Sequence, residues 1–186
     1  MSKVRSFIAI KMPNKLVESL GRLYELLQRD RLPMRLVDLQ NVHLTLAFLG
    51  EVEEKLLEDL QPVLRQEVAK IQPFSVRLEG LGAFNSWAKA RVLWIGCGGP
   101  TDFLENLHFH IREACFKIGF LLEVQEFSPH ITIARSNHWI PLVVSEQCKV
   151  YKVGTLTIDT VTLIRSDLTP NGAIYTDVAS FPLGKA

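Results

Sequence analysis

Hydrophobic and polar residues alternate along two segments that read almost alike, HLTLAF starting at His43 and HITIAR starting at His130. In an extended strand, a period of two places the histidine and the threonine on one face and the aliphatic residues on the other. The pattern therefore predicts two β-strands, each with a polar face and a face that packs against a core. The two segments are separated by 130 − 43 = 87 residues.

The same offset of 87 residues aligns other parts of the chain without a gap, so that WIGC at Trp94 falls on FIAI at Phe7. Each copy reads as strand, helix and strand, and we expect Asn14 and Thr101 to be the N-caps of the two helices. Apolar residues recur at helical spacing in both, at Leu16, Leu20, Leu23 and Leu27, and at Phe103, Leu107, Ile111, Ala114 and Ile118. This registration favours an internal duplication over a chance likeness of two amphipathic helices.

The rest of the chain carries further helix and strand signals. We predict a helix over Glu53–Lys70, strands within Phe74–Phe84 and Lys149–Arg165, and a hairpin turn at Asn171-Gly172. Together these elements predict an α+β fold in which a pseudo-twofold axis relates two lobes. Each lobe is expected to be an antiparallel sheet with helices on its outer face, with a shared cleft between the lobes, and residues 1–186 to form a single bilobal domain.

Composition limits the classes of partner. Of 186 residues, 47% are hydrophobic, and Lys+Arg number 21 against 20 for Asp+Glu. A nearly balanced charge excludes a broad basic field, so any contact with nucleic acid must be local. Three scattered cysteines suit reduced thiols, and the apolar run Phe7–Ile10 is too short for a signal peptide or a membrane span. We expect a cytoplasmic monomer that does not contact membranes.

The repeated motif predicts acid–base chemistry. Two imidazoles, His43 and His130, suit a reaction in which one ring accepts a proton while the other donates one. The hydroxyls of Thr45 and Thr132 share their faces and suit donation to phosphate oxygens. A cyclic phosphodiester is already activated by its strained ring, which removes much of the need for a metal ion, and no metal site or cofactor is predicted. A single such motif is more often structural, but its repetition favours a catalytic pair.

These residues resemble a known family. His43-Leu44-Thr45-Leu46 and His130-Ile131-Thr132-Ile133 match the paired HxTx signatures of the 2H phosphoesterase superfamily. The longer strings NVHLTLAFLGEV, LGAF, RVLW and SPHITIAR resemble its RNA 2′,3′-cyclic phosphodiesterase branch, first described as 2′–5′ RNA ligases. The resemblance covers nearly the whole chain and thins after about Trp139.

The resemblance implies a bilobal, metal-independent enzyme. Its expected substrates are RNA or oligonucleotide ends with a 2′,3′-cyclic phosphate and nucleoside cyclic phosphates, which it hydrolyses to 2′-phosphates. By the same resemblance, His130 activates water and His43 protonates the departing 3′ oxygen. Two alternatives stay open, namely 2′–5′ RNA ligation in the same site and a nucleotide-binding module without catalysis.

Arg135 also matches a family position associated with the bound phosphate or nucleotide. Strict alternation, however, places it on the face of Ile131 and Ile133, away from His130. It reaches the cleft only if the strand ends, bulges or twists near Ala134. Phe48 has the equivalent place in the first motif, where stacking on a base and packing in the core are both open.

Several other residues are weaker candidates. Trp87 and Trp139 suit either a cleft rim that stacks bases or plugs of the core. His108 and His110 sit two apart in a predicted helix, where side chains diverge, so a zinc site is not expected there. Candidate contacts to backbone phosphates are Arg35, Lys89 and Arg91.

Overall fold

The computed structural model describes residues 3–99, 102–122, 126–170 and 172–184. Within them the elements are, in chain order, β1 (Lys3–Lys11), α1 (Asn14–Arg29), β2 (Arg35–Leu36), the 3₁₀ turn η1 (Leu39–Asn41), β3 (His43–Glu53), α2 (Glu54–Val68), β4 (Phe74–Ser86), β5 (Lys89–Gly98), α3 (Asp102–Lys117), β6 (His130–Ile140), α4 (Glu146–Lys149), β7 (Lys152–Ile158), β8 (Thr160–Thr169) and β9 (Gly172–Pro182). No helix in these ranges has the length and apolar character needed to cross a membrane.

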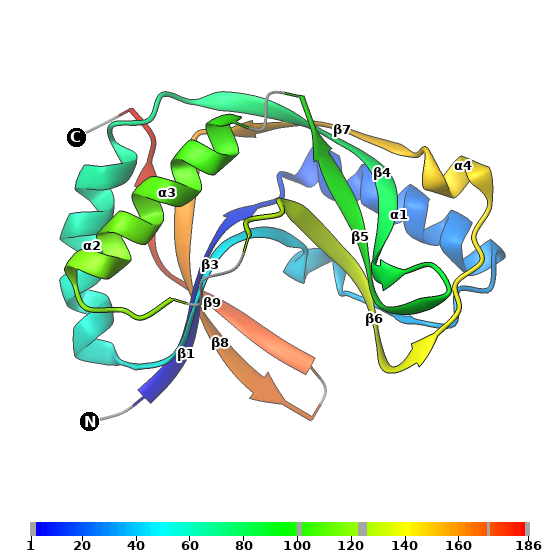
Figure 1. Cartoon of the computed structure of the whole chain (residues 1–186), viewed down its shortest axis with the longest axis horizontal. Helices are drawn as coiled ribbons and strands as arrows, with labels where there is room; N and C mark the ends of the chain where they lie inside the picture. Colours follow the sequence, from blue (N-terminus) through cyan, green and yellow to red (C-terminus); the bar gives the residue numbers. More distant parts are fainter. Residues whose placement is uncertain (1–2, 100–101, 123–125, 171, 185–186) are drawn as a thin grey trace.

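The described strands form one antiparallel sheet in the order β7-β4-β5-β6-β3-β1-β8-β9, with β2 paired to β6. The two motif strands, β3 and β6, are neighbours in the middle, where Leu44 pairs with Ile131. These residues are 131 − 44 = 87 apart, so the pseudo-twofold axis passes through this pair. The α+β class and the pseudo-twofold arrangement are confirmed, and the two lobes are halves of one sheet (Figure 1).

The two halves of the sheet exchange their helices. Helix α1 follows β1 in the chain but packs against β7 of the other half, whereas α3 follows β5 and packs against α2 and β3. Figure 1 shows the result, with α2 and α3 on one side of the molecule and α1 on the other. Each helix buries an apolar face on the sheet, such as Leu20, Leu23 and Leu27 of α1. Each copy therefore covers the core of the other.

The two copies are not related by one constant offset in sequence. The motif strands keep the offset of 87, since β3 begins at His43 and β6 at His130. The strands paired with them, β1 and β5, have a different offset. Lys11 of β1 pairs with His43 and Gly96 of β5 pairs with His130, so the equivalent residues are 96 − 11 = 85 apart. The expected gap-free match is therefore wrong in the first strand. A slip of two residues keeps every side chain on its face, so the sequence pattern cannot detect it.

The helix start also differs from expectation. Helix α1 begins at Asn14, and its N-cap is Pro13, whose carbonyl accepts hydrogen bonds from the backbone N–H groups of Leu16 and Val17. The prediction of Asn14 as the cap is wrong by one residue, because Pro13 already holds the extended backbone of a cap. The expected antiparallel hairpin of β8 and β9 is present, but Gly172 belongs to β9, where it pairs with Thr169, and not to the turn. Thr101 and Asn171 lie outside the described residues.

A buried carboxylate joins the two helices of the outer layer. The side chain of Glu67 on α2 is 5% exposed and accepts hydrogen bonds from Lys70, Lys117 and His110. Burial alone would raise the pKa of Glu67, but these bonds outweigh it and lower the pKa to about 2. His110 is thus a hydrogen-bond partner of Glu67.

We expect Glu67→Gln to lower the free energy of unfolding at pH 7 by about 1–3 kcal/mol, because three donors lose a charged acceptor in a buried place. The folded-state pKa of Glu67 lies below its unfolded value, so this stabilisation is present above the unfolded pKa and is lost as the pH falls toward 2. Urea unfolding of both proteins at pH 7 and pH 3 measures the effect. The exposed Glu146→Gln serves as the control, with a change near zero. A gap between wild type and Glu67→Gln that stays constant with pH would contradict this.

Candidate active site

The two motif histidines are held in the same way. Nδ1 of His43 lies 2.7 Å from the carbonyl oxygen of Asn41, and Nδ1 of His130 lies 2.7 Å from that of Ser128. A carbonyl oxygen only accepts, so Nδ1 must be the donor in each ring. In the neutral rings, Nε2 then carries the lone pair. Both imidazoles are thus fixed in the tautomer that leaves Nε2 for proton transfer.

Aromatic rings pack on both histidines. Phe7 stacks on His43 with ring centroids 4.7 Å apart, and Tyr175 of β9 meets it edge-on at 5.4 Å. Phe84 meets His130 edge-on at 4.6 Å, and the ring of Trp94 lies 6.4 Å from it. These ring contacts restrict the orientation of each imidazole in addition to the hydrogen bond at its Nδ1.

Gly82 makes room for the ring of Trp94. A Cβ on Gly82 would lie 2.1 Å from an atom of the indole, far inside van der Waals contact. Gly82 pairs with Trp94 across β4 and β5, so the indole lies over the glycine. This explains physically why the strings LGAF and RVLW occur together: the glycine of one accommodates the tryptophan of the other.

Each motif strand contains a β-bulge directly after its HxT residues. Between the pairs Ala9–Thr45 and Ile8–Ala47, Leu46 is an extra residue on β3. Ile133 is likewise extra on β6, since Trp94 pairs with Thr132 and Leu93 with Ala134. An extra residue reverses the alternation of all residues that follow it.

The bulges decide where Phe48 and Arg135 point. Leu46 and Ala47 are both buried in succession, as are Ile133 and Ala134, and the next residue in each strand is exposed. Phe48 is 64% exposed, which excludes a core position for it. Arg135 faces the same side as His130, so the bulge removes the conflict with strict alternation.

The carbonyl group of each bulged residue is held by a side chain of the helix beneath it. Nδ1 of His108 on α3 donates to the oxygen of Leu46 at 2.8 Å. The hydroxyl of Tyr24 on α1 donates to the oxygen of Ile133 at 3.2 Å, and the N–H of Val37 donates to the same oxygen at 2.8 Å. Burial raises the pKa of Tyr24, which keeps its hydroxyl a donor.

These elements enclose a cleft of about 560 Å³. The five residues predicted for the site, His43, Thr45, His130, Thr132 and Arg135, all line it. The described lining also includes Arg5, Ser6, Phe7, Val37, Asn41, Phe48, Gly50, Phe84, Val92, Ser166, Leu168, Ala173 and Tyr175. None of these described lining residues is an aspartate or a glutamate. A cleft with two arginines and no acid suits an anion.

Sequence reasoning missed part of this lining. Arg5, Phe7 and Tyr175 reach the cleft from β1 and β9, and Asn41 both orients His43 and donates from its amide to the carbonyl of Ala173 at 3.0 Å. A polar residue stands two places before each histidine, Asn41 in one copy and Ser128 in the other. This repeat could have indicated the residues whose carbonyls orient the histidines. Nothing in the sequence indicated that Tyr175 of β9 would reach the cleft.

The residues named above as weaker candidates for the cleft lie in different places. Trp87 packs partly buried against the core with Lys149 over its ring, so it is a plug rather than a cleft rim. Trp139 is 48% exposed and lies outside the residues that line the cleft. Arg35 pairs with Arg135 through β2 and β6, which brings it to the edge of the cleft.

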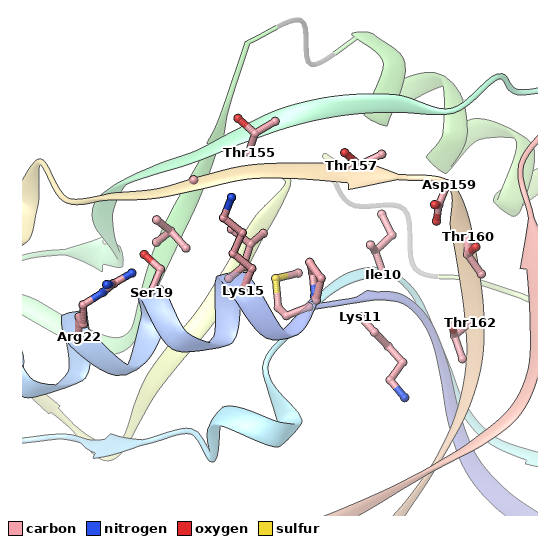
Figure 2. A pocket seen from close by; sticks show the side chains of 15 residues that line it. Ile10, Lys11, Lys15, Ser19, Arg22, Thr155, Thr157, Asp159, Thr160 and Thr162 are labelled. Atoms are coloured by element: carbon pink, nitrogen blue, oxygen red, sulfur yellow. The ribbon is translucent and has the colours of Figure 1, made fainter.

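A second cavity of about 740 Å³ lies between α1 and the strands β7 and β8 (Figure 2). Lys15, Arg22, Thr155 and Thr157 line it, and none of its described lining residues is a histidine or a cysteine. It is larger than the cleft but holds none of the predicted site residues. In the described part of the chain, no three His, Cys, Asp or Glu side chains lie together in a way that would hold a metal ion.

Burial lowers the pKa of both His43 and His130, and the hydrogen bonds to Asn41 and Ser128 only partly offset this. The positive charge of Arg135 lowers both pKa values further, and His130 adds to the effect on His43. The two imidazoles therefore favour the neutral form before an anion binds, and they interact with each other electrostatically.

The fold and this pair of motifs define a two-histidine phosphoesterase. The chain belongs to the 2′-5′ RNA ligase superfamily, whose family model matches residues 19–170.

Individual relatives are similar over the full length. An RNA 2′,3′-cyclic phosphodiesterase of Methanothermobacter thermautotrophicus is 31% identical over 97% of this chain and 100% of its own. A crystal structure of a Thermus thermophilus protein superimposes with a TM-score of 0.81 and 26% identity, covering 97% of this chain and 98% of that one. E. coli LigT complexed with 3′-AMP has the same fold, with a TM-score of 0.81 and 24% identity over 99% of this chain and 100% of that one.

We expect Arg135→Gln to raise the pKa of both His43 and His130, because it removes a positive charge that disfavours both imidazolium forms. NMR titration of the imidazole Cε1–H signals measures both values in the protein without nucleotide. Arg91→Gln, a cation outside the cleft lining, is the control and should leave both titrations unchanged. Unchanged titration in Arg135→Gln would show that the guanidinium does not act on the pair.

Proposed function

We propose that this protein hydrolyses terminal 2′,3′-cyclic phosphates of RNA to 2′-phosphates by metal-independent acid–base catalysis with two histidines. The observation that carries the proposal is the pair of imidazoles, each tied at Nδ1 to a backbone carbonyl and each lining the same acid-free cleft. Full-length relatives named as RNA 2′,3′-cyclic phosphodiesterases support the substrate class.

In the proposed reaction, Nε2 of His130 takes a proton from a water molecule as the water oxygen forms a bond to phosphorus. The bond between phosphorus and O3′ breaks, and the protonated Nε2 of His43 gives its proton to O3′. The hydroxyls of Thr45 and Thr132 donate to the non-bridging oxygens, where negative charge grows. The products are a 2′-phosphate and a free 3′-hydroxyl, with the proton exchanged between the two rings.

The lowered pKa values of the two histidines fit a general acid that becomes protonated when the substrate binds. Before substrate binds, both imidazoles favour the neutral form. A bound phosphodiester brings a negative charge beside them, which raises the pKa of the nearer ring and stabilises its proton. Substrate binding thereby favours one neutral and one protonated histidine, which is the state that acid–base catalysis requires.

Phe48 and Arg135 supply the asymmetry of the cleft. They occupy equivalent places after the two bulges, and one is an exposed aromatic ring while the other is a guanidinium. We assign Phe48 to stacking against the base and Arg135 to the phosphate or the base. A 2′,3′-cyclic phosphate, whose two ring oxygens could each face either histidine in a symmetric cleft, then binds in one orientation.

We expect His43→Ala and His130→Ala each to lower the turnover of a nucleoside 2′,3′-cyclic phosphate by about 10²–10⁴-fold, because each removes one proton-transfer group. Chromatography of the products measures the rate, and circular dichroism checks the fold. His138→Ala, an exposed histidine of β6, is the control and should keep full activity.

Near-normal turnover in either variant would remove that histidine from the mechanism. If wild type does not hydrolyse the cyclic phosphate but opens it by attack of an added RNA 5′-hydroxyl, so that a bond from phosphorus to O5′ forms as the bond to O3′ breaks, ligation is the activity. If wild type only binds nucleotides, the chain is a binding module.

Regiochemistry tests the roles of the two rings. If His43 protonates the departing O3′, the product carries a 2′-phosphate. His43→Ala should then slow substrates with an alkoxide leaving group far more than analogues whose leaving group needs no proton, such as nitrophenolate. His130→Ala should slow both kinds about equally, because water must be activated in either case. A 3′-phosphate product, or the opposite pattern in the variants, would reverse the assignment.

A further inference from the structure

A cluster of one aromatic and two cationic side chains lies beyond the outer end of the cleft. Lys89 lies over the ring of Trp139 with its Nζ 5.6 Å from the centroid, and the guanidinium of Arg91 lies 5.2 Å from it. The side chain of Trp139 nevertheless remains 48% exposed. We call Lys89, Arg91 and Trp139 the outer cluster.

The outer cluster lies on the same face of the sheet as the histidines. Ala90 pairs with Ile140, and both pack against the core on the helix-covered face. Their neighbours Lys89 and Trp139 therefore point to the opposite face, which is the face of His43 and His130. Arg91 contacts the same indole and so belongs to that face as well.

The outer cluster is also continuous with the cleft. Val92 and Arg135, which pair across β5 and β6, line the cleft at its outer end. Lys89 lies three residues beyond Val92, past an irregularity in the pairing of β5 between Ala90 and Val92, so the two residues are at most about 10 Å apart along the chain. A nucleotide chain whose last residue occupies the cleft would pass over this cluster with its next one or two residues.

The local charge is unlike that of the whole chain. Lys+Arg number 21 and Asp+Glu 20 overall. The segments 33–37, 84–93 and 135–142, which meet at this end of the sheet, contain Arg35, Lys89, Arg91 and Arg135 but no acidic residue. Such a local concentration of cations beside an exposed indole suits a single-stranded nucleic acid, whose phosphates and bases match the two kinds of side chain.

We propose that the outer cluster binds the single-stranded RNA that precedes the terminal cyclic phosphate, with Trp139 stacking on a base and Arg91 and Lys89 contacting backbone phosphates. This inference rests on the proposed function and assigns it a substrate preference. The enzyme acts on oligonucleotide ends in preference to single nucleotides, because only a longer chain reaches the outer cluster.

The test compares a nucleoside 2′,3′-cyclic phosphate with a five-nucleotide RNA that ends in the same cyclic phosphate. Wild type should show a higher kcat/KM for the oligonucleotide. Trp139→Ala should lower that value roughly 5- to 100-fold, as expected for loss of one stacked base, with no change for the single nucleotide. The double variant Lys89→Gln/Arg91→Gln should flatten the salt dependence for the oligonucleotide alone, with the log–log slope reduced by about 0.7 for each lost phosphate contact.

Two controls match the side chains that are changed. Phe116→Ala removes an aromatic ring that is 72% exposed on α3, and Lys55→Gln removes an exposed cation on α2. Neither should alter the preference for the oligonucleotide. Equal loss on both substrates in Trp139→Ala, or no loss on either, would overturn the proposal.

Failure of the proposed function gives a different result. In that case wild type would hydrolyse neither substrate. Fluorescence anisotropy with a labelled five-nucleotide RNA then decides on the outer cluster alone. Weaker binding by Trp139→Ala than by Phe116→Ala supports it, and equal affinities overturn it.

Discussion

The cleft depends on one backbone feature that occurs twice, the bulge after each HxT segment. Without the extra residue, Phe48 and Arg135 would point into the core, where an arginine without a partner is costly. The carbonyl of each bulged residue accepts a hydrogen bond from a side chain of a helix, and that of Ile133 also accepts from the backbone N–H of Val37. The exchange of helices makes this possible: α1 of the first copy holds the bulge of the second, through Tyr24, and α3 of the second holds that of the first, through His108. Each half of the site is therefore held in place by the other copy.

The duplication explains the symmetry of the chemistry but not its direction. The two imidazoles are held alike, each at Nδ1 by a backbone carbonyl, that of Asn41 or that of Ser128. Their other surroundings differ. The two bulges are held by different donors from positions that are not equivalent in the helices, and the ring of His43 is covered by Phe7 and Tyr175 whereas that of His130 meets Phe84. A substrate with two nearly equivalent oxygens needs such differences if only one of them is to leave.

The sequence predicted the elements and the histidine pair because both depend on local pattern. Alternation in the motif strands and helical spacing between them are properties of neighbouring residues, and the repeat doubled the signal. Features set by contacts between distant strands were not accessible. The two-residue slip of β5 relative to β1 preserves every face, so no hydrophobic pattern distinguishes it. The bulge at Ile133 was recognisable only as a conflict between Arg135 and the alternation. Tyr175 reaches the cleft because the β8–β9 hairpin lies beside β1, a pairing of distant segments that no local pattern indicates.

Charge is divided between the two faces of the sheet, and this division bears on how the proton is supplied. Glu67 lies buried in the helical layer, where two lysines and His110 surround it, while the described lining of the cleft has arginines and no acid. An acid beside His43 would raise its pKa and keep it protonated without substrate, but it would also repel a phosphate. A described lining without acids does the reverse, since it attracts an anion while burial and Arg135 hold the pKa of both imidazoles below its ordinary value. In the proposed reaction, the negative charge that stabilises the protonated His43 comes from the bound phosphodiester, so the substrate's own charge helps to set the protonation state that the proposed hydrolysis needs.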